Sequence, residues 1–329
     1  MKKRRILTGV VTLMSVVTLA ACSQNSSDTK IVTMKGDTIT VGDFYDKVKS
    51  SSASKQALLS MIIQQVFEKA YGDKVTDKEV TEAYNKAAEY YGDSFETVLS
   101  QQGYTKDDYK AQIRSQKLVE YAVKKEAEKN ITTTDYKNAY KSYTPEITAQ
   151  VIQLDSEDTA KSVLSEVKAD GADFAKIAKE KTKGSKTEYT FDSGSTDLPT
   201  DVRTAALALD KNGISDVIST TDSTGTQTAY YIVKVTKKSD KNADWKAYKS
   251  RLKEIIVASR TSDSNFQNKV IGNELKKANV KIKDKTFSDI LATFTAAADS
   301  SATTTTTTTA AADTTTANQT TAAETTSAE

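Results

Sequence analysis

The sequence predicts a multidomain α+β fold, in which N- and C-terminal segments form a mainly helical domain around an inserted α+β domain. Three observations lead to this prediction. Apolar residues recur at helical spacing from residue 40 to residue 143. Strand-like alternation then marks 147–154 and 230–235, and helical spacing returns at 245–278. We therefore assign 31–144 and 240–294 to the helical domain and 145–239 to the insert.

The first residues predict export. Lys2 to Arg5 are cationic, and the apolar run that follows, Ile6 to Ala21, is shorter than the ~20 residues that span a membrane. This pattern is typical of a secretory signal peptide, which we assign to 1–21. Leu19-Ala20-Ala21-Cys22 resembles the bacterial lipobox, which implies a diacylglycerol on Cys22 and cleavage before it.

A lipid on Cys22 would anchor the chain at the extracytoplasmic face of a Gram-positive type cell membrane, with polar residues 22–30 as a flexible tether. The alternative is an ordinary secretory signal followed by an incidental cysteine. Lipidation is favoured because Cys22 is the only cysteine, and a single thiol cannot form an internal disulfide.

The helical domain begins after two short extended segments within 31–39. Capping-box patterns predict helix starts at Thr40, Thr76 and Thr105, because an acidic residue follows each threonine after three positions. A wide apolar stripe within 55–71 predicts a long helix between the first two of these starts.

The insert opens with a predicted strand at 147–154 and closes with the clearest strand, 230–235, and we expect these two to pair. Helices are predicted at 159–167, 174–181 and 202–209. The stretch from 184 to 200 is rich in Gly, Ser, Thr and Asp, which predicts a loop.

Two helices, at 245–258 and 266–278, are predicted after the insert. From residue 295 to 329 the chain is almost entirely Ala, Thr, Ser and scattered acids. Such a composition buries too little apolar surface to offset the entropy of ordering, so we expect a disordered tail.

Composition excludes several kinds of chemistry. The chain has no histidine, which removes Ser-His-Asp and Cys-His catalysis and the common histidine metal sites. No Gly-rich phosphate-binding loop is present, and the net charge is only +2, so we expect no cofactor, no metal and no nucleic-acid partner. Function must therefore depend on surfaces, carboxylates and hydroxyls.

The insert resembles the parvulin family of peptidyl-prolyl isomerases. The resemblance rests on the strand around Gln150 and on four later segments: 171–178, 205–209, 213–215 and 230–235. Ahead of it, 36–45 is similar to the start of the SurA/PrsA chaperone domain. Together with the lipobox, this order resembles the PrsA-type foldases of Gram-positive bacteria, over residues 1 to about 290. The resemblance implies a foldase that assists exported, unfolded polypeptides after translocation.

The resemblance also implies a candidate isomerase pocket. Parvulins hold the proline ring in an apolar cup and polarise the prolyl amide through a polar network that includes two histidines in active members. Aligned in order, this chain has Gln150 and Tyr231 at the two histidine positions, and Leu198 and Val202 in the cup; the position usually occupied by Cys or Asp falls near Gly184. Gln150 and Tyr231 can form hydrogen bonds but cannot reproduce a paired imidazole network.

Several hypotheses stay open. The chain acts either as a chaperone with a degenerate isomerase domain or as an active prolyl isomerase, and a homodimer stays open in both cases. In the chaperone hypothesis, apolar helical surfaces that carry aromatic residues bind the unfolded polypeptide, and Tyr84, Tyr90, Tyr91 and Tyr104 are the candidates. A solute-binding or adhesive surface lipoprotein is the alternative from another class, although solute binders generally need two α/β lobes and only one short α+β unit is predicted.

Overall fold

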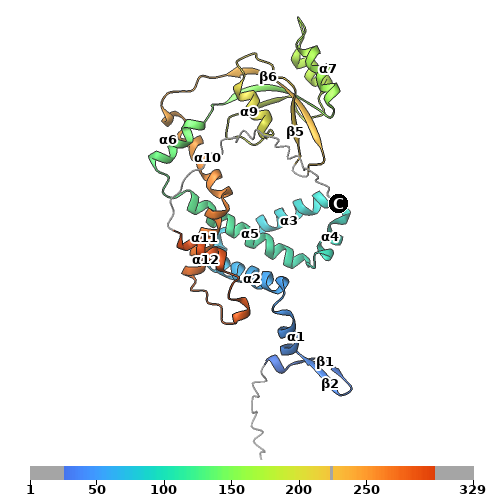
Figure 1. The fold of residues 1–329 in the computed structure, drawn as a ribbon, viewed down its shortest axis with the longest axis vertical. Helices are drawn as coiled ribbons and strands as arrows, with labels where there is room; N and C mark the ends of the chain where they lie inside the picture. The colour runs from blue at the N-terminus through green and yellow to red at the C-terminus, as the bar shows by residue number, and fades with distance from the viewer. Residues whose placement is uncertain (1–25, 223–224, 301–329) are drawn as a thin grey trace, which may run out of the picture.

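A computed structural model of the chain describes residues 26–222 and 225–300 (Figure 1). Cys22, the signal peptide and the predicted tail beyond residue 300 lie outside the described residues. The sheet of the insert lies at one end of the molecule, and most of the helices lie below it (Figure 1). Helices enclosing a mixed insert confirm the predicted α+β class. Among the described residues, no helix is both long and apolar enough to span a membrane.

The described chain begins with a projecting segment, residues 26–49, which we call the arm. It contains a 3-10 turn (Ser26–Asp28), strands β1 (Lys30–Met34) and β2 (Asp37–Thr40), and helix α1 (Val41–Val48). The antiparallel hairpin turns at Gly36, whose φ of 85° favours glycine. Thr40 then starts α1 with the capping box that the sequence predicts.

Helix α5 (Lys106–Ala127) is the centre of the helical domain, which we call the helical unit. It packs against α2 (Ser52–Tyr71), α3 (Asp77–Tyr91), α10 (Lys249–Ser262) and α11 (Ser264–Lys277). Helix α4 (Phe95–Gln101) follows α3. The core residues come from both ends of the sequence: Phe67, Val75, Val80, Leu118, Ala122, Val123 and Val270. The N- and C-terminal segments therefore form one packed unit.

A second, smaller core packs α6 against α10, beside the two connections to the insert. Helix α6 (Thr133–Ser142) precedes the insert, and a 3-10 turn (Trp245–Tyr248) leads from it into α10. Leu252 and Ile256 of α10 pack against Tyr136 and Tyr143. Tyr136 and Trp245 stack with ring centroids 5.1 Å apart.

The insert is a four-stranded antiparallel sheet in the order β4-β3-β6-β5. The strands are β3 (Ile147–Leu154), β4 (Glu188–Phe191), β5 (Ile218–Thr221) and β6 (Thr228–Lys238). Helices α7 (Glu157–Val167) and α8 (Phe174–Lys181) cover one face, and α9 (Thr200–Ala208) covers the other. The expected pairing of the first and last strands is confirmed, and they form the centre of the sheet.

Two elements differ from the prediction. The stretch read as loop contains β4, a short edge strand that owes its order to pairing with β3. Residues 295–299, expected to be part of a disordered tail, belong to helix α12 (Ala292–Asp299), which packs on α11. Gly272 permits this contact, since a Cβ there would lie 2.1 Å from the carbonyl oxygen of Phe294. A close helix contact of this kind is not visible in the composition of the segment.

Candidate functional site

The register of the central strands decides which candidate residues can meet. Gln153 pairs with Tyr231, whereas Gln150 pairs with Lys234. Side chains alternate between the two faces of a strand, so Gln150 and Tyr231 point to opposite faces of the sheet. The structure therefore does not bring Gln150 into the predicted pocket. Val151, one position further, lies on the same face as Tyr231 and packs in the same core.

Tyr231, Leu198 and Val202 do come together, under α9. They belong to one apolar cluster that also includes Phe191 and Val151. Val202 has no exposed surface, Leu198 is 5% exposed and Tyr231 is 8% exposed. The cup positions are therefore filled by the chain's own side chains. These side chains therefore offer little accessible surface to a proline ring.

Several polar groups border this cluster: Tyr189 packs against it, and Arg203 Nη1 donates to the carbonyl of Leu198 at 3.1 Å. Burial raises the pKa of Tyr231, and a hydrogen bond with Thr220 acts in the opposite direction. Gly184 lies beside Gln153, whose Oε1 would be 3.1 Å from a Cβ at that position. The backbone N–H of Lys183 donates to the carbonyl of Gln153 at 2.7 Å. The border thus offers two phenols, an amide, a hydroxyl and a guanidinium, which form hydrogen bonds but are weak proton donors and acceptors at neutral pH.

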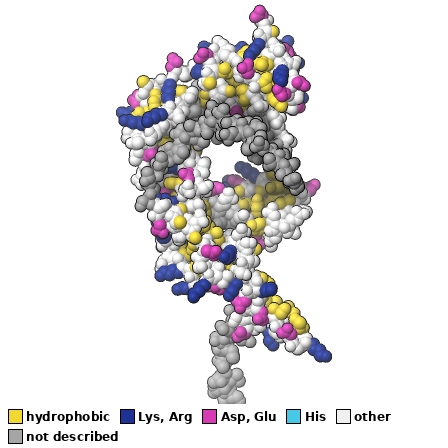
Figure 2. Space-filling view, viewed as in Figure 1, with side chains coloured by type: hydrophobic (Ala, Val, Ile, Leu, Met, Phe, Trp, Pro, Cys, Tyr) yellow, Lys and Arg dark blue, Asp and Glu magenta, His cyan; other side chains and the backbone are white. Residues whose placement is uncertain are grey.

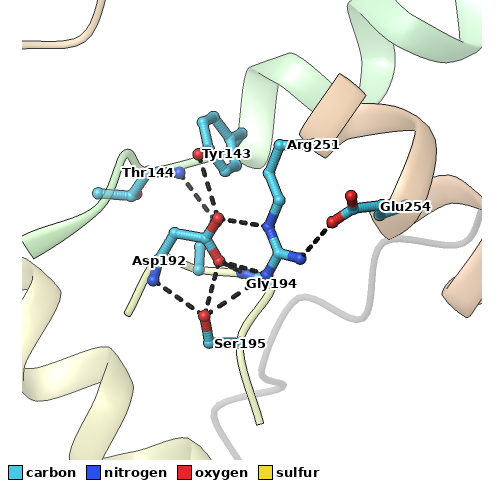
Figure 3. A network of polar contacts seen from close by, with 8 residues as sticks. Tyr143, Thr144, Asp192, Gly194, Ser195, Arg251 and Glu254 are labelled. Atoms are coloured by element: carbon cyan, nitrogen blue, oxygen red, sulfur yellow. Dashed lines mark hydrogen bonds and ion pairs between the residues drawn. The ribbon is translucent and has the colours of Figure 1, made fainter. Parts of the chain in front are cut away.

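A stronger polar site, which the sequence did not predict, lies where the insert meets α10 (Figure 3). Asp192 follows β4 and accepts two hydrogen bonds from Arg251, one from Nε at 2.6 Å and one from Nη2 at 2.8 Å. Tyr143 Oη, Ser195 Oγ and the N–H of Gly194 donate to the same carboxylate. We call this group the junction network.

The electrostatics of the junction network follow from burial and pairing. Burial alone would raise the pKa of Asp192, but hydrogen bonds from Arg251 and Ser195 outweigh it and hold that pKa below its usual range. Burial, reinforced by the charge of Asp192, raises the pKa of Tyr143. A polar cavity of about 800 Å³ adjoins the network, and its lining includes Glu146, Asp197 and Tyr248. Since Asp192 and Arg251 are 59 positions apart in the sequence, no local pattern predicts this pair.

The four candidate tyrosines do meet in one place. Tyr84 and Phe95 lie edge to face at 5.3 Å, and Tyr91 stacks on Phe95 at 6.1 Å. The ring of Tyr109 contacts the rings of both Phe95 and Tyr104. Aromatic rings from α3, α4, α5 and the loop between α4 and α5 thus form one group, which we call the tyrosine cluster: Tyr84, Tyr90, Tyr91, Phe95, Tyr104 and Tyr109.

Part of the tyrosine cluster is open to solvent. Tyr90 is 84% exposed, and Tyr91 and Tyr104 are also exposed. The ammonium groups of Lys106 and Lys110 lie 5.4 and 5.3 Å from the ring centre of Tyr84. An exposed aromatic group bordered by cations is suited to contacts with apolar and aromatic side chains of another polypeptide. Within residues 26–222 and 225–300, no group of acidic or cysteine side chains is arranged to hold a metal ion.

Comparison with known proteins agrees with this architecture. The family model described as "PPIC-type PPIASE domain" matches residues 131–250, which includes the insert, α6 and the start of α10. The foldase protein PrsA of Streptococcus mutans serotype c is 70% identical over 298 residues, covering 91% of this chain and 90% of that protein.

Two solved structures are similar over most of the chain. The crystal structure of foldase protein PrsA from Streptococcus pneumoniae has 46% identity and a TM-score of 0.73, and covers 80% of this chain and 99% of that one. The PrsA structure from Lactococcus lactis has 36% identity and a TM-score of 0.60, with 81% and 99% coverage. With this identity over nearly the whole length of its relatives, and with the isomerase-type insert in the same setting, the chain belongs to the PrsA foldase family.

Proposed function

We propose that this foldase is a lipid-anchored, extracytoplasmic protein that assists the folding of exported polypeptides after translocation. The lipobox-like Leu19-Ala20-Ala21-Cys22 supports the anchor, and family membership supports the foldase role. Replacing Cys22 with Ser in the full-length chain should release the protein from the membrane fraction. Retention of that variant on the membrane would contradict a lipid anchor at this residue.

We further propose that the chain acts mainly as a chaperone and that its prolyl isomerase activity is weak or lost. The observation that carries this proposal is the filled pocket: Leu198 and Val202 are buried, and a tyrosine and a valine occupy the strand positions that face them. Without histidines, the site has no imidazole to polarise a prolyl amide. In this proposal the helical segments 31–144 and 240–294 bind clients, and the insert 145–239 serves as a binding or spacing module.

The tyrosine cluster is the surface that we assign to client binding. Its rings pack on one another, so the exposed faces of Tyr90, Tyr91 and Tyr104 are held in place at little entropic cost. Unfolded exported chains expose the aromatic and aliphatic side chains that such a surface accepts. Binding of these segments would keep them from aggregating without any covalent step.

Two assays on one preparation of residues 23–300 test the proposal. The first measures suppression of aggregation of an unfolded exported protein, and the second measures a proline-limited refolding reaction with a test protein that does not aggregate. We expect suppression of aggregation without acceleration of refolding at substoichiometric amounts. Acceleration under those conditions would mean that the insert is an active isomerase despite its filled pocket.

Matched variants locate the client surface. The double variant Tyr90→Ser/Tyr104→Ser should lose most of the aggregation suppression, because it removes exposed rings from the cluster. Phe44→Ser is the control, since Phe44 is an exposed aromatic residue outside the cluster. Equal losses in both variants would show that any exposed ring serves, and would remove the cluster from the proposal.

The strand content of the structure disfavours the solute-binding or adhesive alternative. The described residues contain one four-stranded sheet and one two-stranded hairpin instead of two α/β lobes. A saturable increase in thermal stability with one small molecule of a screen would bring the alternative back.

A further inference from the structure

The arm exposes apolar side chains that no other described part of the chain covers. Phe44 is 55% exposed and Met34 is 50% exposed, and no residue of α1 is buried. Figure 2 shows hydrophobic side chains exposed along the projecting arm. The exposed apolar residues of the arm are Ile31, Val32, Met34, Ile39, Val41 and Phe44.

The hairpin gathers part of this surface on one face. Val32 pairs with Ile39, and Met34, two positions along the same strand, lies on the face of Val32. An isolated two-stranded hairpin is marginally stable in water, because it buries too little apolar surface. A cluster of exposed apolar side chains on such an element indicates an interaction surface.

The arm is nevertheless held in one orientation at its base. Tyr45 Oη donates a hydrogen bond to Asp284 at 3.0 Å, and the Tyr45 ring lies 6.5 Å from that of Phe287. The ammonium of Lys49 lies 3.7 Å from the same carboxylate. The apolar surface therefore projects from the helical unit as a supported element, at the end of the molecule opposite the sheet of the insert (Figure 1).

The position of the arm in the sequence limits what can cover it. Eight residue steps separate Cys22 from Lys30 at the start of β1, a length of at most about 29 Å when fully extended. If Cys22 carries a lipid, as the proposed function holds, this short tether keeps the hairpin within reach of the bilayer at a high effective concentration.

We propose that the arm docks on the outer leaflet of the membrane, with its exposed apolar side chains inserted at the headgroup boundary. This inference rests on the proposed lipid anchor. The arm carries four lysines (30, 35, 47 and 49) and four aspartates (28, 37, 43 and 46), so its net charge is zero. Attachment therefore comes from apolar burial and is insensitive to salt, unlike the attachment of a polybasic segment. Docked in this way, the arm directs the insert away from the membrane.

A site-specific fluorescent probe tests the docking on the lipidated full-length chain. Because lipidation uses the only native thiol, Met34→Cys introduces a unique site for an environment-sensitive dye. Met61→Cys is the control, since Met61 has a similar exposure, 55% against 50%, and lies on α2. The vesicles contain phosphatidylcholine and phosphatidylglycerol, with and without a spin-labelled acyl chain that quenches the dye on contact.

The expected result is a blue-shifted emission at position 34 that the spin-labelled lipid quenches at low and high salt, with neither effect at position 61. Protein bound to the vesicles with an unshifted, unquenched probe at position 34 would overturn the docking and leave the lipid anchor intact. A blue shift without quenching that grows with protein density would mean that a second copy covers the arm, and would equally overturn it. Failure of the lipidated chain to bind vesicles would overturn the anchor and the docking together.

Discussion

Replacing Arg251 with Met should destabilise the junction between the insert and α10, because it leaves the Asp192 carboxylate buried without its cation. Asp192 is 8% exposed at its side chain, and Arg251 is 35% exposed. Two charge-assisted hydrogen bonds are lost, each worth about 1.5–3 kcal/mol in a typical protein. Since Arg251 is partly solvated and three other donors still serve the carboxylate, we expect a net loss of about 2–3 kcal/mol in the free energy of unfolding.

The pH dependence separates this explanation from simple loss of packing. In the native chain the pKa of Asp192 is lowered, so its stabilising contribution is present above the unfolded pKa of 3.8 and is lost as pH falls through the folded value. In the Arg251→Met variant the guanidinium no longer offsets burial, so the folded pKa of Asp192 should rise relative to the native chain. The variant should then recover stability relative to the native chain as pH falls, so the difference between them shrinks near pH ~4.

Urea unfolding followed by tryptophan fluorescence measures both effects. Trp245 is the only tryptophan and packs in the core that joins α6 to α10, so it reports on this junction. Arg251→Lys is the control, because it keeps the charge and loses the paired geometry; we expect an intermediate loss. A difference below about 0.5 kcal/mol for Arg251→Met at pH 7, or a difference that does not change with pH, would refute the assignment of a buried ion pair.

Three other outcomes are expected. Gly272→Ala should detach α12 and lower the free energy of unfolding by about 1–3 kcal/mol, because the new methyl group would clash with the Phe294 carbonyl. Asn273→Ala on the same helix is the control, and equal urea midpoints for the two variants would contradict the close contact. Val202→Asp should unfold the insert, because a buried unpaired carboxylate costs about 4 kcal/mol or more. Loss of circular dichroism measures the unfolding, and an intact insert would mean that Val202 borders an open pocket. Tyr71 should titrate with a pKa of about 12, raised by burial and by its hydrogen bond to Glu274. The absorbance of tyrosinate, compared between the native chain and Tyr71→Phe, measures this pKa, and a value near 10 would refute the part-buried hydrogen bond.

Local sequence patterns were sufficient for much of the fold. The capping boxes at Thr40, Thr76 and Thr105 predicted helix starts that the structure confirms, because the side chain and the acid three residues later satisfy neighbouring backbone donors. The strand at 147–154 and the helix at 174–181 agree with β3 and α8 in both limits. These features depend on residues that are close in the sequence, so local patterns are enough to predict where the elements begin and end.

The pocket shows where such reasoning ends. A shift of one residue moves a side chain to the other face of a strand, so an alignment that chose Gln150 rather than Val151 put the candidate on the wrong side of the sheet. The four tyrosines could be named from composition, but only the packing of α3, α4 and α5 brings them together. The sequence by itself determined the helices, the insert and the likeness to a foldase family. The tertiary structure decided which side chains meet, because register and the pairing of Asp192 with Arg251 are set by contacts between distant segments.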